Sequence, residues 1–228
     1  MRIGKHLSHV VLGGLATLAA ISAGSAQETS RSQERGFWFG ALLNPALINT
    51  DKYISDSTAR FAAGIGLGVQ AGYDFPPGLT AFIRAEDAIV PRKIGTYQFR
   101  NIDYGARWRF PGLRKIMRNG VPYAEVAFTN RMIVQNNVKV EGRVYSENGS
   151  LPFPSIEAEG IQWSWGAGVN LPLRKRVQLN AGLSHTVGTF NSIRFAGGPV
   201  DGWDFKGSDF RLHLGLTWRP QKSDPDQR

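Results

Sequence analysis

The residues of this 228-residue chain that could do covalent chemistry are serines and histidines. Ser184 and Ser192 are candidate nucleophiles for ester hydrolysis, and His185 is a candidate general base. Successive residues of a β-strand point to opposite faces, so Ser184 and His185 cannot pair as nucleophile and base if they lie on a strand. The spacing therefore predicts no catalytic residues, and we expect the protein not to be an enzyme.

Composition excludes several other kinds of site. The absence of cysteine excludes a disulfide framework, a thiolate zinc site and a cysteine nucleophile. Apart from two histidines near the N-terminus, only His185 and His213 remain, with no acidic cluster beside them, so we expect no metal site and no cofactor. The formal net charge is +9, but the basic residues are scattered, and we expect no nucleic-acid partner.

The N-terminus has the build of an export signal. Arg2 and Lys5 precede a short apolar run at residues 10–21, and small residues at 23–26 offer a cleavage site. The run is shorter than the roughly 20 residues of a membrane-spanning helix. We expect residues 1–26 to be a signal peptide and residues 27–35 to be a short periplasmic segment.

Downstream, apolar and polar residues alternate with a period of two, which predicts strands with one apolar face. The clearest case is residues 61–75, where Ile65, Leu67 and Val69 share the apolar face. We interpret a change of phase near Arg100 and Asn101 as a β-bulge. The alternating segments are 37–44, 61–75, 79–89, 97–110, 123–134, 161–171, 177–187 and 210–219.

The connections between these segments alternate in length. Short connections with Pro and Gly follow at 76–78, 111–122 and 172–176, while longer polar connections lie mainly at 45–60, 135–160 and 188–208. Short turns at one end and long loops at the other are typical of membrane barrels. We predict an all-β fold, an eight-stranded antiparallel up-and-down transmembrane β-barrel over residues 36–219, followed by a polar tail at 220–228.

The polar faces favour a lumen over a solvated exterior, because they are rich in Gly, Ser, Asn and Gln with few charges. Eight strands enclose a lumen that side chains can just fill, and buried charges need partners. We therefore expect a plug of ion pairs, with a narrow anion-preferring path lined by the excess of Arg as the alternative. The expected lumen charge network is Arg84, Glu86, Asp103, Arg107, Glu125, Arg131, Arg211 and His213.

Aromatic residues near the strand ends are expected to form girdles at the two membrane interfaces. The expected girdle consists of Tyr73, Phe75, Phe110, Trp163, Trp165 and Trp218.

Three Gly-rich or aromatic segments carry a resemblance to a known family. They are GIGLGVQAGYDF at 64–75, WSWGAGVNLPL at 163–173 and FRLHLGLTW at 210–218. With the eight alternating segments, they resemble the small porin-like, OmpA-type outer membrane β-barrels of Gram-negative bacteria. Such barrels commonly finish with an aromatic residue, whereas this chain continues past Trp218. The resemblance implies export to the outer membrane, contact with outer membrane lipids and lipopolysaccharide, and a possible surface ligand of the long loops.

The leading hypothesis is a non-enzymatic integral barrel with a structural or surface-interaction role. A narrow channel or transporter for small solutes or hydrophobic compounds is the alternative. A secreted soluble barrel would place the apolar faces inside. A lipid A-modifying hydrolase is a further alternative, but Ser184-His185-Thr186 departs from the His-x-Ser pair of lipid A deacylases.

Overall fold

The computed structural model describes most of the chain downstream of residue 34. The expected signal peptide lies outside the described residues, as do all but Arg35 of segment 27–35 and all but Pro220 of the tail. The described residues are 35–50, 62–91, 96–114, 117, 119–135, 139–140, 143–144, 156–174, 176–195, 198–199 and 204–220.

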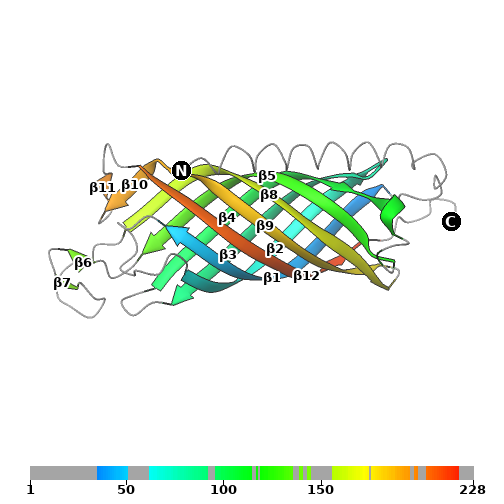
Figure 1. The fold of residues 1–228 in the computed structure, drawn as a ribbon, viewed down its shortest axis with the longest axis horizontal. Coiled ribbons are helices and arrows are strands. Elements are labelled where there is room, and N and C mark those ends of the chain that lie inside the picture. The colour runs from blue at the N-terminus through cyan, green and yellow to red at the C-terminus, as the bar shows by residue number, and fades with distance from the viewer. Residues whose placement is uncertain are drawn as a thin grey trace, which may run out of the picture.

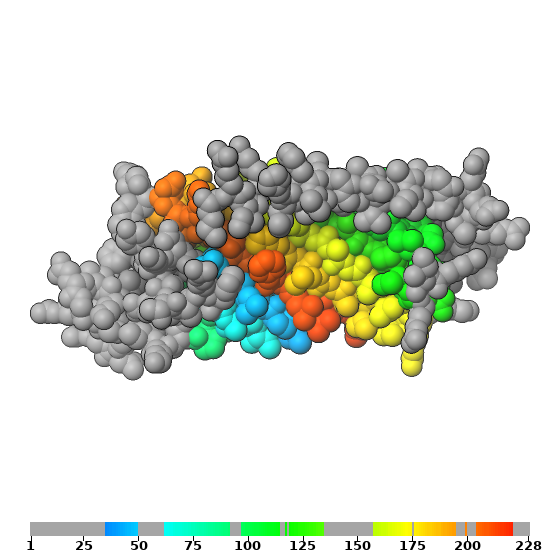
Figure 2. Space-filling model, viewed as in Figure 1, coloured from blue at the N-terminus to red at the C-terminus, as the bar shows by residue number. Residues whose placement is uncertain are grey.

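Eight long strands form a closed antiparallel barrel (Figure 1). Each strand pairs with its neighbour in the chain, and the last pairs with the first over ten register partners from Phe39↔Trp218 to Thr50↔Gly207. Figure 2 shows β1 and β12 lying side by side in the outer wall. The predicted fold class is confirmed. The strands are β1 (Gly36–Thr50), β2 (Ala62–Phe75), β3 (Leu79–Pro91), β4 (Thr96–Arg109), β5 (Val121–Gln135), β8 (Ile156–Arg174), β9 (Val177–Phe190) and β12 (Phe205–Trp218).

Shorter elements mark the two ends of the barrel. At one end, here called the loop end, β10 (Ser192–Phe195) pairs with β8 and with β11 (Gly198–Pro199). A separate two-stranded ladder joins β6 (Lys139–Val140) to β7 (Arg143–Val144). The opposite, turn end carries the 3₁₀ turn η1 (Pro111–Leu113). Among the described residues, no helix is long and apolar enough to cross a membrane.

The barrel wall is apolar outside and polar inside over most of its height. On β12, Leu212 and Leu214 are about 40% exposed, whereas the alternate residues Arg211 and His213 are 1% exposed. The same alternation runs along β2 and β3. A soluble barrel has the opposite polarity, because water-facing residues are then polar and the core is apolar. The observed polarity is that of a transmembrane barrel.

At the loop end the interior becomes apolar, and the outer wall carries charged side chains as well as apolar ones such as Leu47 and Ile89. An apolar cluster fills the interior there, with the Phe190 and Phe205 rings stacked 4.7 Å apart between centroids. Next to the interior residues Ala88 and Phe99, the exposed residues Asp87 and Arg100 form an ion pair on the outside. This loop-end cluster consists of Ala46, Ile48, Ala88, Val90, Tyr97, Phe99, Ile133, Ala158, Phe190, Ile193 and Phe205.

The loop-end cluster explains one wrong prediction. β4 pairs with β3 and β5 without a register shift, so the bulge expected near Arg100 and Asn101 is absent. Tyr97, Phe99 and Asn101 all point inward. Because the inward residues change from apolar to polar at Asn101, the sequence pattern resembles a change of phase although the strand is regular. The register shift that the described strands do contain lies between Pro172 and Arg174.

Two boundaries also differ from expectation. β1 does not end at Asn44–Pro45 but continues to Thr50, with Pro45 opposite Ile65. Proline fits a strand here because a strand residue directs its N–H to one neighbour only, so a single ladder bond is lost. The long connections 45–60, 135–160 and 188–208 are correspondingly shorter, since strand residues occupy the start of the first and both ends of the other two. Their remaining tips lie mostly outside the described residues.

Two interior glycines make room for aromatic rings. A Cβ on Gly105 would lie 2.5 Å from the Phe82 ring, and one on Gly72 would lie 2.5 Å from the Trp38 ring. Both rings are buried inside the barrel. The glycines of β2 and β4 therefore let large side chains lie against the inner wall.

Candidate functional site: the charged lumen

The middle of the lumen holds a network of buried charges. Four arginines and four carboxylates meet there from β3, β4, β5 and β12, each 5% exposed or less. Asp209 is the member that the sequence analysis missed. It lies two residues before Arg211, so extending the alternation of β12 upstream would have found it. The network residues are Arg84, Arg107, Arg131, Arg211, Glu86, Asp103, Glu125 and Asp209.

Arg84 lies at the centre of this network. Its Nε and Nη2 donate to Asp103 Oδ2 at 2.9 and 2.6 Å, and its Nη1 donates to Glu125 Oε1 at 3.0 Å. Glu86 Oε1 lies 3.2 Å from Arg84 Nε. One guanidinium thus joins carboxylates on three strands, as its planar set of donors allows.

Arg211 spans the lumen from the opposite wall. Its Nη1 pairs with Glu86 and lies 3.2 Å from Asp103 Oδ2, and its Nη2 donates to Thr186 Oγ1 at 2.8 Å. Arg131 pairs with Asp209 from β5. These contacts link β12 to β3, β4 and β5 across the lumen, although β12 is hydrogen-bonded in the sheet only to β1 and β9.

Arg107 and Glu125 form the part of the network nearest the turn end. Arg107 Nε and Nη2 donate to Glu125 Oε2 at 3.1 and 2.9 Å. The guanidinium also lies 4.1 Å from the centroid of the Tyr123 ring and 5.2 Å from that of Phe82. Beyond it, Asp74 pairs with Arg109 and Arg219 at the turn end.

A buried serine and histidine lie beside the network. Ser184 Oγ is 2.7 Å from His213 Nε2, while His213 Nδ1 is hydrogen-bonded to Asn44 Oδ1 at 3.1 Å, with Glu86 Oε1 also 3.1 Å away. With the proton on Nδ1, Nε2 accepts from the serine hydroxyl, which is the arrangement of a nucleophile and its base. Ser184 and His213 are each 1% exposed.

Sequence reasoning missed this pair because it depends on the pairing of β9 with β12, which residue spacing does not reveal. Ser184 and His185 do point to opposite faces, as the alternation predicts. His185 lies on the outer wall, stacked on Phe210 with centroids 4.2 Å apart. Ser192 is exposed on β10, opposite Glu159.

The eight charged residues expected in the lumen all lie inside the barrel, and all are buried. The network has four cations and four anions, so the excess of Arg on which the anion-path alternative rested is absent from this part of the lumen. Within the described residues, no three His, Asp or Glu side chains are placed to hold a metal ion.

Most of the expected girdle lies on the outer wall. Phe75, Trp163, Trp165 and Trp218 are 38–55% exposed, and Tyr73 is half-buried between Phe37 and Phe75. Phe110 is an error. It is 6% exposed, because the strand alternation ends at Arg109 and Phe110 instead precedes the 3₁₀ turn. Further outward aromatic residues, which were not part of the expected girdle, are Phe37, Phe39, Tyr104, Trp108, Phe128 and Phe210.

The comparisons with known proteins agree with this architecture. The sequence matches no protein-family model and no curated protein. The structure is similar to that of Neisserial surface protein A, with a TM-score of 0.55 and 15% identity over 81% of this chain and 97% of that chain. It is also similar to outer membrane protein AlkL, solved in lipid bilayers, with a TM-score of 0.53 and 12% identity over 86% of this chain and 95% of that chain. The chain therefore has the fold of the small eight-stranded outer membrane β-barrels.

Proposed function

We propose that this chain is a non-enzymatic integral outer membrane barrel with a structural or surface-interaction role, and that ion pairs plug its lumen. The observation that carries the proposal is the balanced set of four arginines and four carboxylates inside a wall that is apolar outside. The similar folds of outer membrane proteins support the location.

A conducting lumen would need a path through this network. Each buried charge is costly without its partner, so opening the network means separating pairs such as Arg84–Asp103 and Arg107–Glu125. An ion that passed the network would then meet the loop-end cluster, where buried apolar side chains replace polar groups. Hydrophobic constrictions oppose the passage of ions. Both features support a plugged barrel over a channel or transporter.

The N-terminal pattern supports export. A positive start, a short apolar run and small residues at 23–26 are the build of a signal peptide, so residues 1–26 direct the chain across the inner membrane. The apolar wall then contacts outer membrane lipids and lipopolysaccharide.

The loop end supports a surface role. Asp87, Arg100, Glu159 and Arg194 are exposed there, over an apolar interior. Exposed charges suit water, so the charged part of this wall rises above the hydrocarbon and holds the loops away from the lipid surface. A ligand of the loops would meet this polar rim first.

Cell fractionation, gel mobility and conductance together test the proposal. The full chain is expressed, the outer membrane fraction is run on a gel with and without boiling, and the purified protein is added to a planar lipid bilayer. We expect outer membrane recovery, a band that shifts on heating, and no discrete conductance steps. Recovery as a soluble periplasmic protein would overturn the location, and regular conductance steps would overturn the plug.

A second candidate function, a lipid-modifying hydrolase, is favoured by the 2.7 Å contact between Ser184 and His213. The burial of both side chains argues against it, because a substrate carbonyl must reach the serine oxygen. A fluorophosphonate probe decides between the two. Labelling of the wild type that is lost in Ser184→Ala would establish the hydrolase, whereas equal absence of labelling in both supports the non-enzymatic barrel.

A further inference from the structure

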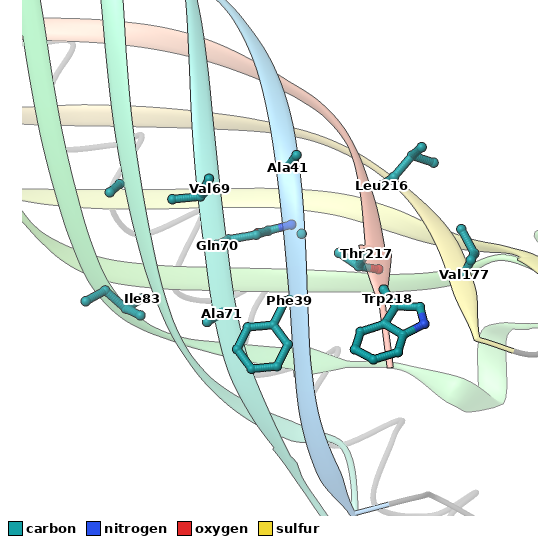
Figure 3. Close-up of a pocket in the computed structure, with 12 residues that line it drawn as sticks. Phe39, Ala41, Val69, Gln70, Ala71, Ile83, Val177, Leu216, Thr217 and Trp218 are labelled. Carbon is teal, nitrogen blue, oxygen red and sulfur yellow. The ribbon is translucent and has the colours of Figure 1, made fainter. Parts of the chain in front are cut away.

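The outer wall carries a groove that strand packing does not fill. It has a volume of about 770 Å³ and lies across β12, β1, β2 and β3. Figure 3 shows the Phe39 and Trp218 rings side by side at one end of it, with Val69, Leu216 and Ala41 farther along. Its volume lies within the roughly 300–1,000 Å³ of small-molecule pockets.

The strand register explains the groove. One outward row of cross-strand neighbours runs Leu216, Ala41, Val69, Ala85, and the next runs Trp218, Phe39, Ala71, Ile83. Three alanines thus form a low floor between large side chains. The flanking Trp218, Phe39 and Ile83 are 45–50% exposed and form its rim.

Arginines cluster at the turn end of this groove. Arg176 directly precedes the groove residue Val177, and Arg174 is the register partner of Val177 on β8. Arg219 directly follows Trp218, and its N–H donates to the Arg176 carbonyl at 2.9 Å. Arg174 and Arg176 are both exposed. Arg109 and Arg219 share the carboxylate of Asp74, so the described residues of this corner include more arginines than carboxylates.

We propose that this groove binds one anionic phospholipid from the leaflet at the turn end, with an acyl chain on the alanine floor and the phosphate at Arg174 and Arg176. The proposal rests on the membrane location given under the proposed function. A groove on the lipid-facing wall is covered by hydrocarbon, and its aromatic end lies where interfacial girdles meet the headgroups. Cations at that level attract anionic lipids, with about 1 kcal/mol for each Lys or Arg.

The same features argue against a second copy of the chain as the occupant. A symmetric dimer across this groove would bring two sets of arginines together, which like-charge repulsion disfavours. The groove is also concave on each copy, so two copies would leave it empty between them instead of filling it.

Native mass spectrometry of the full chain in detergent tests the proposal, with phosphatidylglycerol and phosphatidylcholine titrated separately. We expect one tightly bound phosphatidylglycerol, held at least about tenfold more tightly than phosphatidylcholine. About 1 kcal/mol for each arginine corresponds to about fivefold in affinity, so two arginines together would allow a preference of about 25-fold. The tenfold threshold lies below that value. The double variant Arg174→Gln/Arg176→Gln removes this preference, and the loop-end control Arg194→Gln keeps it.

A second pair of variants tests the groove itself. Ala41→Leu/Ala71→Leu fills the floor and is expected to weaken the bound lipid at least fivefold, whereas Ala167→Leu on the outer face of β8 leaves it unchanged. Lipid binding that is equal in the floor variant and the wild type overturns the proposal. So does a two-chain species that the floor variant abolishes, because the groove would then be a dimer contact.

Two controls separate the remaining explanations. Inorganic phosphate added in millimolar excess should leave the lipid bound, since the acyl chain contributes; full displacement would show a simple anion site and overturn the proposal. Each variant is also run on a gel with and without boiling. A heat-shifted band with no bound lipid refutes the lipid site alone, while loss of the shift in the wild type refutes the barrel on which it rests.

Discussion

Removing one carboxylate from the lumen should destabilise the barrel strongly. In Glu125→Gln, Arg107 loses the negative charge of its only described carboxylate partner while it stays 2% exposed, because a glutamine oxygen still accepts hydrogen bonds but carries no charge. Arg84 loses one contact but keeps Asp103 and Glu86. Leaving one charge of a buried pair without its partner costs about 3–5 kcal/mol. The unfolding equilibrium should therefore shift by a factor of roughly 100 or more.

The double-mutant cycle with Arg107→Met isolates the charge effect. Arg107→Met alone should cost less than Glu125→Gln, because Glu125 keeps its 3.0 Å contact with Arg84. Arg107→Met/Glu125→Gln leaves three cations and three anions in the network. We expect the double variant to be about 2 kcal/mol more stable than Glu125→Gln alone.

Urea unfolding of the barrel refolded into lipid vesicles provides the measurement, followed by tryptophan fluorescence and gel mobility. The control is Asp87→Asn, which breaks the exposed Asp87–Arg100 pair at 3.3 Å and should cost about 1 kcal/mol or less. A Glu125→Gln variant as stable as Asp87→Asn would refute the reasoning, because it would mean that water screens the lumen charges.

Two further substitutions test packing inside the barrel. Gly105→Val should abolish the heat-shifted band on gels, because the valine side chain would clash with the Phe82 ring and the Val126 carbonyl. The control Gly36→Val, whose Cβ would have no atom within 4 Å, should fold. Equal folding of the two variants would contradict the close approach at Gly105. Phe190→Ala should lower the free energy of unfolding by about 3–5 kcal/mol in the vesicle assay, because it empties the middle of the loop-end cluster. A loss below about 1 kcal/mol would show that the cluster is loosely packed.

The eight strands could be predicted from sequence because lipid imposes the same demand on every one of them. Outward residues such as Leu67 and Leu214 must be apolar, so the alternation survives whatever the interior contains. It failed on β4 at Tyr97 and Phe99, because the apolar residues there lie on the inner face and the polar Gln98 and Arg100 on the outer one, so the alternation continues with its two faces exchanged. Phe110 was misplaced for a related reason, since alternation carries no information once the strand has ended.

The partners inside the lumen could not be predicted, because they depend on register across the barrel. Residue types showed that Arg84, Arg107 and Glu125 face inward, but not that Arg84 bridges Glu125 and Asp103. The contact between Ser184 and His213 likewise needs β9 and β12 in one register. The period of the sequence determines the face of the strand on which a side chain lies, whereas the register between strands determines which side chains it contacts.

The most direct test of the account is the environment of successive residues on β2. The chain contains no cysteine, so single substitutions at positions 67, 69 and 70 can each carry one spin label in the barrel refolded into lipid vesicles. We predict that labels at Leu67→Cys and Val69→Cys collide readily with oxygen dissolved in the bilayer, and that a label at the inward position Gln70→Cys does not. Equal oxygen access at all three positions, or access of a water-soluble reagent to Leu67→Cys and Val69→Cys, would contradict a barrel whose apolar face meets lipid.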